Sequence, residues 1–290
     1  MVAVGDGIGV MTASIIDTHM HLFYLDRFSY PWLEEEPLLN ANHTFPTYWA
    51  EASKLGIESA VFMEGDVSDA QMEGEASFAT TVAREVRAVV AACRPEREDF
   101  WDYAQRVAAN PTIRGFRRIL HPLPEDWCLQ PRFVKNVARL AEIDRHFELC
   151  VGRRQLPSAL SLARACPNVR FIMDHCGIPE IAKGELAVWR EQVRRIAELP
   201  NVACKLSGII AYGPTIGWSI EHFRPVFDHV IQCFGWDRLM WGSDWPVCNR
   251  TASLTAWVEL TLNLLDGYSW DETERLLRVN ARAAYGIKRV

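Results

Sequence analysis

Hydrophobic residues gather in short runs that recur along the chain and alternate with longer segments of mixed character. The runs are rich in Val, Ile and Phe and span residues 15–21, 58–64, 86–93, 113–120, 146–152, 169–177, 202–208 and 239–246. Short, nearly continuous apolar strands are typical of a parallel sheet that is covered on both faces. The pattern therefore predicts eight buried parallel strands.

The segments between the runs have the period of amphipathic helices. In residues 185–199, large apolar side chains recur at steps of three and four, which places them on one helix face: Leu186, Trp189, Val193 and Ile196. Pro200 is expected to end this helix because proline cannot continue it. Near the carboxyl terminus, Ser269 and Glu272 have the spacing of a capping box, which predicts the start of another helix.

Eight alternations of strand and helix in one uninterrupted series favour a closed (β/α)8 barrel, the TIM-barrel fold. A doubly wound sheet is the alternative, but no nucleotide-binding glycine pattern follows the first strand. Because no linker or low-complexity tract interrupts the series, residues 15–290 are expected to form one barrel domain. The longest connection, residues 22–57, carries aromatic residues and prolines and is expected to cover the barrel mouth.

Composition and the amino terminus narrow the partners and the compartment. A net charge of −6 argues against a surface for nucleic acid or an anionic membrane, so we expect a small-molecule substrate. The eight cysteines include no CxxC pair, which indicates reduced thiols in a reducing compartment. Residues 1–14 lack the basic start of a secretory signal and are predicted to be a flexible extension, with Met1 or Met11 as the first residue. No run approaches the roughly 20 apolar residues of a membrane span, so we expect a cytoplasmic protein.

Two histidines close the first predicted strand. His19 and His21 are two residues apart, and side chains along a strand alternate between its faces, so both imidazoles are expected to point the same way. Asp17 lies on the same face one step deeper and is expected to orient them. Because the active sites of (β/α)8 barrels lie at the carboxyl ends of the strands, this HxH pair is a candidate site.

Closure of the barrel would bring a carboxylate to these histidines. Asp244 follows the eighth strand in GSDWP, and the eighth strand lies beside the first only in a closed barrel. His175 ends the sixth strand in DHCGIP, across the mouth. Taken singly, Asp244 is equally well a turn or capping residue, and His175 a buried core histidine. Their joint position at strand ends favours one catalytic site.

Other polar or aromatic residues near strand ends are candidates for substrate binding. Arg117 ends the fourth strand and Lys205 lies in the seventh, where a cationic side chain is costly unless it is paired or faces a ligand. The alternative for both is a salt bridge to a strand carboxylate such as Glu64 or Asp174. Glu64 is itself a candidate site residue, and Trp32 is expected either to form an apolar wall of the site or simply to pack.

Together these residues resemble the amidohydrolase superfamily, in its amidohydrolase-related branch of lactonases. The similarity covers residues 15–287 and rests on IIDTHMHLF, YPWL, IRGFRRIL, MDHCGIP, CKLSG, GSDWPV and VNARAAYGI, which occur in this order. The resemblance implies a hydrolase that opens sugar lactones or lactone intermediates of aromatic degradation, and hence a place in carbohydrate or aromatic catabolism.

The sequence departs from the metal-dependent members of the superfamily that it resembles. Those members usually add a lysine or glutamate at strand four and a histidine at the end of strand five. Here strand four ends in Arg117 and Arg118, strand five ends in VGRR, and its histidine, His146, stands at the other end. A two-metal centre is therefore not expected. A single zinc or manganese ion remains an option, with nitrogen and oxygen ligands from His19, His21, Asp244 and His175.

The resulting hypothesis is lactone hydrolysis. Asp244 acts as general base on water, and His19, His21 and His175 polarise the carbonyl, directly or through one ion, so that no metal is strictly required. Two alternatives stay open at this point. One is a metal-dependent decarboxylase of the same superfamily, and the other is a barrel that binds a sugar acid without turnover.

Overall fold

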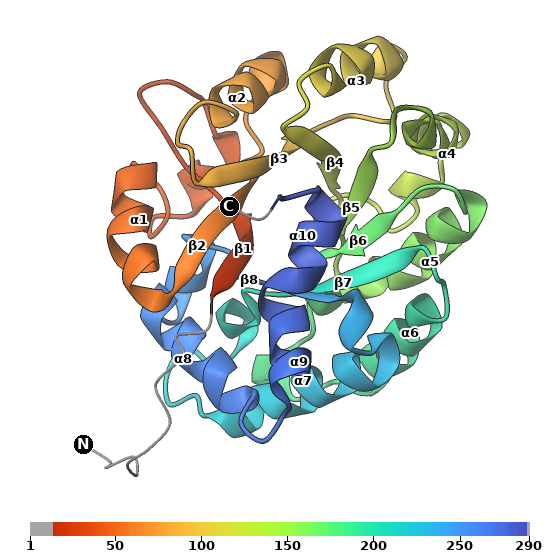
Figure 1. Cartoon of the computed structure of the whole chain (residues 1–290). Helices are drawn as coiled ribbons and strands as arrows, with labels where there is room; N and C mark the ends of the chain where they lie inside the picture. Colours follow the sequence, from red (N-terminus) through yellow and green to blue (C-terminus); the bar gives the residue numbers. More distant parts are fainter. Residues whose placement is uncertain (1–13, 289–290) are drawn as a thin grey trace.

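Eight strands form one parallel sheet, in sequence order, in the computed structural model, which describes residues 14–288 (Figure 1). They are β1 (Ile15–Met20), β2 (Ile57–Met63), β3 (Val86–Ala92), β4 (Ile113–Ile119), β5 (His146–Cys150), β6 (Phe171–Met173), β7 (Val202–Ser207) and β8 (Leu239–Gly242). Each predicted apolar run overlaps one of these strands. The strands are almost wholly buried, as expected for a parallel sheet covered on both faces.

The sheet returns to its first strand just beyond β8. Met20 and Trp245 form a parallel bridge, and the backbone N–H of His21 donates to the carbonyl of Trp245 at 2.7 Å. The N–H of Asp244 likewise donates to the carbonyl of His19 at 2.7 Å. These bonds close the barrel, which confirms the predicted (β/α)8 fold and excludes the doubly wound sheet.

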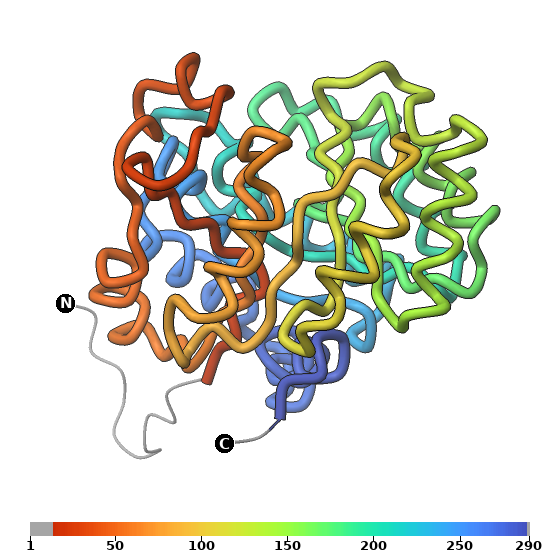
Figure 2. The backbone as a smooth tube through the Cα atoms, turned by 90° about the horizontal axis from the view of Figure 1, so that it is seen from above, coloured from red at the N-terminus to blue at the C-terminus, as the bar shows by residue number. Residues whose placement is uncertain are grey.

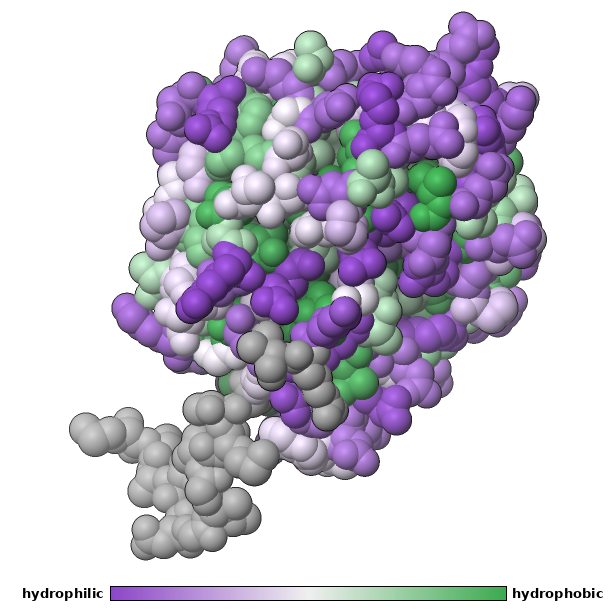
Figure 3. Space-filling view, turned by 45° about the horizontal axis from the view of Figure 1, so that its top comes forward, coloured by the Kyte–Doolittle hydropathy of each residue, from purple (hydrophilic) through white to green (hydrophobic). Residues whose placement is uncertain are grey.

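Helices form the outer layer of the barrel (Figure 1). One follows each strand: α1 (Phe45–Ala52), α2 (Met72–Ala79), α3 (Phe100–Ala108), α4 (Pro131–Ala138), α5 (Leu156–Ala165), α6 (Ala187–Ala197), α7 (Ile220–Phe234) and α8 (Leu254–Leu264). In α6 the predicted face is buried through Trp189, Val193 and Ile196. On the face drawn in Figure 3 hydrophilic residues predominate, as expected where the outer sides of helices meet solvent.

Two short carboxyl-terminal helices follow, α9 (Trp270–Glu274) and α10 (Asn280–Tyr285), and α9 begins at the predicted capping box of Ser269. Tyr285 of α10 packs with side chains from inside the barrel, at the amino-terminal ends of the strands. Figure 2 shows α10 at the end of the barrel opposite to the connection between β1 and α1. This end is therefore closed, and only the other end can hold an open site.

The remaining expectations concern cysteines, membrane segments and the termini. All eight cysteines are free thiols, as predicted. Among residues 14–288, no helix has the length and apolar character needed to cross a bilayer. The extension predicted over residues 1–14 lies outside the described residues except for Ser14, as do residues 289–290 at the end of the predicted domain.

Candidate active site

A cavity of about 380 Å³ opens at the carboxyl ends of the strands. Five of the predicted site residues line it: His21, Trp32, Arg117, His175 and Asp244. Much of its wall is apolar and comes from Leu39, Ile119, Ile178, Tyr212 and Val247. The cavity thus joins a polar floor to an apolar wall, which is the usual construction of a small-molecule site.

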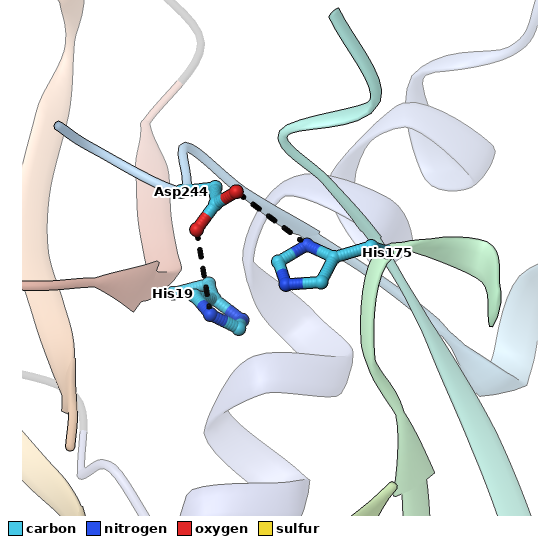
Figure 4. Close-up of side chains that lie close together, drawn as sticks. All are labelled: His19, His175 and Asp244. Carbon is cyan, nitrogen blue, oxygen red and sulfur yellow. Dashed lines mark ion pairs between the residues drawn. The ribbon is translucent and has the colours of Figure 1, made fainter. Parts of the chain in front are cut away.

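The predicted cluster assembles around Asp244. Its Oδ1 lies 3.6 Å from Nε2 of His19 and 3.4 Å from Nε2 of His21, while its Oδ2 lies 3.7 Å from Nδ1 of His175. The two Nε2 atoms of the HxH pair are 3.2 Å apart, so both imidazoles do point the same way. Figure 4 shows the carboxylate between His19 and His175, which come from opposite sides of the barrel mouth.

Local backbone geometry sets these side chains in place. Asp244 and His175 both have left-handed backbones, with φ of 58° and 51°. Such conformations are uncommon for residues other than glycine and are often found at functional sites. Asp17 supports the cluster differently from expectation, because its Oδ1 accepts the backbone N–H groups of His19 and Ser243 at 3.0 and 2.8 Å. It therefore orients the backbone of the site, and the imidazoles only indirectly.

Hydrogen bonds determine where the imidazole lone pairs point. Nδ1 of His21 lies 3.0 Å from the carbonyl of Met63, which can only accept, so Nδ1 carries the hydrogen and Nε2 has the lone pair. Arg117 places an N–H group 3.1 Å from Nε2 of His19, which must then accept as well. The lone pair of His21 Nε2 and the Asp244 carboxylate therefore lie side by side, while the lone pair of His19 Nε2 accepts from Arg117. Such an arrangement attracts a proton or a cation.

Burial shifts the ionisation of the cluster. It raises the pKa of Asp244 to about 6, against the opposing effect of the nearby His175 and Arg117. It lowers the pKa of His21 to about 3, with a further contribution from Arg117, and it holds the pKa of His19 well below the ordinary value. At neutral pH the site therefore consists of neutral imidazoles around a largely ionised carboxylate.

The donor set fits a single divalent metal ion. Ligand atoms of His19, His175 and Asp244 all lie within 4.8 Å of one another. The separations of 3.2–3.6 Å among His19, His21 and Asp244 are close to the distance of about 3.3 Å between two ligand atoms of a tetrahedral zinc ion. Oδ2 of Asp244 is buried and has no hydrogen-bond partner, which leaves it available.

Arg117 and Glu64 form a buried ion pair at the edge of the cavity. Nε of Arg117 donates to Oε1 of Glu64 at 2.6 Å, and a second guanidinium nitrogen donates to the Glu64 carbonyl at 2.7 Å. Asp174 lies 3.4 Å from the guanidinium on another side. The salt bridge weighed as the alternative for Arg117 is thus present. Arg117 nevertheless lines the cavity, whereas Glu64 is not in its lining and holds the guanidinium in position.

Lys205 does not line the cavity. It is fully buried, and its Nζ pairs with Glu148 and, at 3.4 Å, with Asp174. Glu148 also accepts the Tyr285 hydroxyl at 2.7 Å, so the charge lies in a network that extends toward the closed end of the barrel. We therefore revise the expected role of Lys205 from substrate contact to ion-pair partner, because a cation in the barrel interior is stable only when it is paired.

The long connection between β1 and α1 forms one wall of the mouth, as expected. Trp32 lines the cavity and is fixed by its indole N–H, which donates to the carbonyl of Gly65 at 2.8 Å. Glu36 from the same connection pairs with Arg250, which follows β8, at 2.6 Å. This ion pair joins the connection after β1 to the loop after β8, across the place where the barrel closes.

Sequence reasoning missed several polar residues of the cavity lining, among them His121, Tyr212 and Arg250. Each stands a few residues beyond the end of its strand, in a loop whose path the strand pattern does not determine. Tyr212 could have been predicted as a site residue from its position. It follows the seventh strand by five residues, and the loops at this end of the strands form the site.

The barrel fold and the cluster of histidines with Asp244 indicate a class of protein, and similarity to known proteins shows that the chain belongs to it. A (β/α)8 barrel that joins an HxH pair on β1 to an aspartate after β8 has the architecture of the hydrolases that the sequence resembles. A family model described as amidohydrolase matches residues 16–287. The chain therefore belongs to the amidohydrolase family, which confirms the resemblance.

Individual relatives are similar over most of the chain. L-fucono-1,5-lactonase of Burkholderia multivorans is 30% identical over 269 residues, which cover 84% of this chain and 86% of the relative. 4-Sulfomuconolactone hydrolase of Rhizobium radiobacter is 26% identical, and the matched residues cover 79% of this chain and 75% of the relative. A crystal structure of a Burkholderia multivorans amidohydrolase with bound zinc matches with a TM-score of 0.86 and 26% identity, over 95% of this chain and all of that chain (100%).

Proposed function

We propose that this protein hydrolyses small lactones and that Asp244 is the general base. The observation that carries the proposal is a single, largely ionised carboxylate set among neutral imidazoles on the floor of a cavity. Relatives of similar length are named as lactone hydrolases. A general base with a pKa near the working pH combines the correct protonation state with effective proton transfer.

The side chains supply what ring opening requires. Asp244 takes a proton from water, and the resulting hydroxide adds to the lactone carbonyl. Negative charge on the carbonyl oxygen is stabilised by the guanidinium of Arg117. The one N–H group of neutral His175 already faces the Ser207 carbonyl, 3.1 Å from Nδ1, so His175 positions the site instead. When the ring C–O bond breaks, its electron pair moves to the departing oxygen, to which Asp244 returns the proton. The product is a hydroxy acid.

The charges of the cavity favour neutral, hydroxylated lactones over anionic ones. The guanidinium of Arg117 is already paired with Glu64 and Asp174, and that of Arg250 with Glu36. No cation is left over in the described lining to neutralise an added sulfonate or carboxylate, and an uncompensated charge is costly to desolvate. Sugar lactones of the L-fucono-1,5-lactone kind therefore fit better than muconolactone-type acids.

A panel of lactones tests the proposal. Aldono-1,5- and 1,4-lactones, muconolactone-type acids and N-acyl amino acids should be assayed with a pH indicator, and carbon dioxide should be measured in parallel. We expect the sugar lactones to be hydrolysed fastest. Faster hydrolysis of the amides would contradict the assignment, carbon dioxide release would establish a decarboxylase, and binding without product would establish a sugar-acid-binding barrel.

We further propose that a single ion can bind at His19, His21 and Asp244 but is not strictly required. A bound zinc or manganese ion would act as a Lewis acid on the carbonyl oxygen. The guanidinium of Arg117 places a fixed positive charge 3.1 Å from Nε2 of His19, where it stabilises negative charge on the lactone and weakens the binding of any cation. Turnover is therefore expected to persist after exhaustive chelation, with metal content measured on the same sample. Loss of activity that zinc or manganese restores stoichiometrically would overturn this part.

A further inference from the structure

The hydroxyl of Tyr212 is among the polar groups of the cavity that the steps proposed so far leave unused. Tyr212 ends the turn that follows β7 (Ile209–Tyr212), is half-buried and lines the cavity. Its ring centroid lies 5.9 Å from that of His175, at an interplanar angle of 59°. A phenol thus stands beside His175, which Asp244 also contacts.

The hydroxyl of Tyr212 differs from those of most other tyrosines in its bonding. Five of the seven tyrosines have a hydroxyl that is hydrogen-bonded to a protein group: Tyr24, Tyr30, Tyr48, Tyr103 and Tyr285. Within residues 14–288, the hydroxyls of Tyr212 and Tyr268 form no such bond. Tyr268 packs in the outer layer against Phe227 and Trp236. A phenol that lines a cavity without a protein partner is satisfied by water or by a ligand.

The turn that carries Tyr212 is held firmly against the site. The N–H of Ala211 donates to the carbonyl of Gly208 at 2.9 Å, and the Thr251 hydroxyl donates to the carbonyl of Ile210 at 2.7 Å. Gly208 itself packs directly against the Asp244 side chain. Tyr212 and Asp244 therefore have a common support, which gives the phenol a defined position relative to the base.

We propose that Tyr212 is a catalytic residue whose hydroxyl donates a hydrogen bond to the ring oxygen that departs when the lactone opens. The role rests on the proposed lactone hydrolysis. Burial and the nearby Asp244 hold the pKa of the Tyr212 phenol well above its ordinary range, so it retains its proton at neutral pH and can donate. The hydrogen bond strengthens as the C–O electron pair moves to the oxygen, because bonds to charged groups are the stronger ones. Tyr212 keeps its proton, and the oxygen is finally protonated by Asp244.

Kinetics of Tyr212→Phe on two kinds of lactone test this role. For the best sugar lactone, whose departing oxygen is an alkoxide, kcat is expected to fall about 10- to 100-fold with little change in KM. For dihydrocoumarin, whose departing oxygen is a phenolate and needs less stabilisation, the loss is expected to be about threefold or less. Tyr268→Phe, which removes an equally unpaired hydroxyl outside the cavity, should leave both rates unchanged.

The outcomes separate this role from the proposed function. If wild-type protein opens no lactone, the proposed function itself fails. If wild-type protein is active and Tyr212→Phe retains kcat, loses equal activity on both lactones or changes only in KM, then Tyr212 does not assist the departing oxygen. A structural defect would appear as a lower melting temperature and an equal loss on both substrates.

Discussion

At the scale of single residues, two buried aspartates of the site differ in the direction in which their pKa is shifted. Asp244 and Asp174 are both fully buried carboxylates, yet burial raises the pKa of Asp244, whereas Lys205 and His19 hold that of Asp174 well below its usual range, against the effect of burial. The carboxylate with the raised pKa is suited to accept and release a proton, and the other is suited to remain a fixed charge.

Asp244→Asn is expected to lower kcat by about 10²- to 10⁴-fold while the fold stays intact, because the amide keeps the shape but cannot accept the proton of water. Asp144→Asn is the matched control. Asp144 has a similar left-handed backbone, with φ of 50°, but lies outside the cavity and pairs with Arg170. Turnover should be measured on the best lactone together with circular dichroism. If Asp244→Asn retains a third or more of wild-type turnover, Asp244 is not the base.

The pH dependence follows from the same carboxylate. Asp244 must be deprotonated to act, and its pKa is raised to about 6, so kcat/KM should be constant above this pH and fall about tenfold per unit below it. His21, with a pKa lowered to about 3, does not titrate in this range. A profile of kcat/KM between pH 4.5 and 8, in steps of about half a unit, measures this. A midpoint near the ordinary aspartate value would place the base elsewhere.

At the scale of elements, the turns after β6, β7 and β8 form the site by packing closely on one another. Gly208 after β7 has a φ of 53°, and a Cβ atom placed on it would overlap the Cβ of Asp244. The loop after β8 can approach the turn after β7 only because this position has no side chain.

Gly208→Ala is therefore expected to displace Asp244 and lower kcat at least about tenfold, beyond the cost of about 1–2 kcal/mol for a left-handed alanine. Gly217→Ala isolates that backbone cost, since Gly217 has a φ of 69° and nothing within 4 Å of the added atom. Both variants should lose stability in urea unfolding, but only Gly208→Ala should lose turnover. Equal turnover in the two variants would show that the close packing at Gly208 does not position the base.

At the scale of the whole molecule, the barrel interior contains a chain of charges between the active site and the closed end. Asp174 contacts His19 at 3.4 Å and Lys205 at 3.4 Å, and Lys205 in turn pairs with Glu148, which accepts the hydroxyl of Tyr285 in α10. The carboxyl-terminal helix is thus linked electrostatically to His19 of the candidate site.

Lys205→Met is expected to destabilise the protein by about 3–5 kcal/mol, because it leaves two buried carboxylates without their shared cation. Lys183→Met, which removes an exposed pair with Glu180, should cost about 1 kcal/mol or less. Urea unfolding measures the loss of stability in both variants. The KM of the folded Lys205→Met variant tests whether Lys205 contacts the substrate. A raised KM with unchanged stability would restore Lys205 as a substrate contact.

Much of this protein is determined by local sequence pattern. The period of two along β1 is enough to bring His19 and His21 to one face, and the eight apolar runs are enough to predict the strands and, through barrel closure, the meeting of Asp244 with the histidines. These predictions succeed because strand alternation and the order of parallel strands depend on the backbone alone.

Only the tertiary structure decided which buried charges reach the cavity. Arg117 and Lys205 look alike in sequence as cations in strands, yet Arg117 reaches the cavity and Lys205 points into a closed network. Likewise, Tyr212 and Arg250 reach the site from loops whose paths depend on close packing at Gly208 and on the Glu36 pair. The physical reason is that the partner of a buried charge, and the course of a loop, are set by residues distant in sequence that only folding brings together.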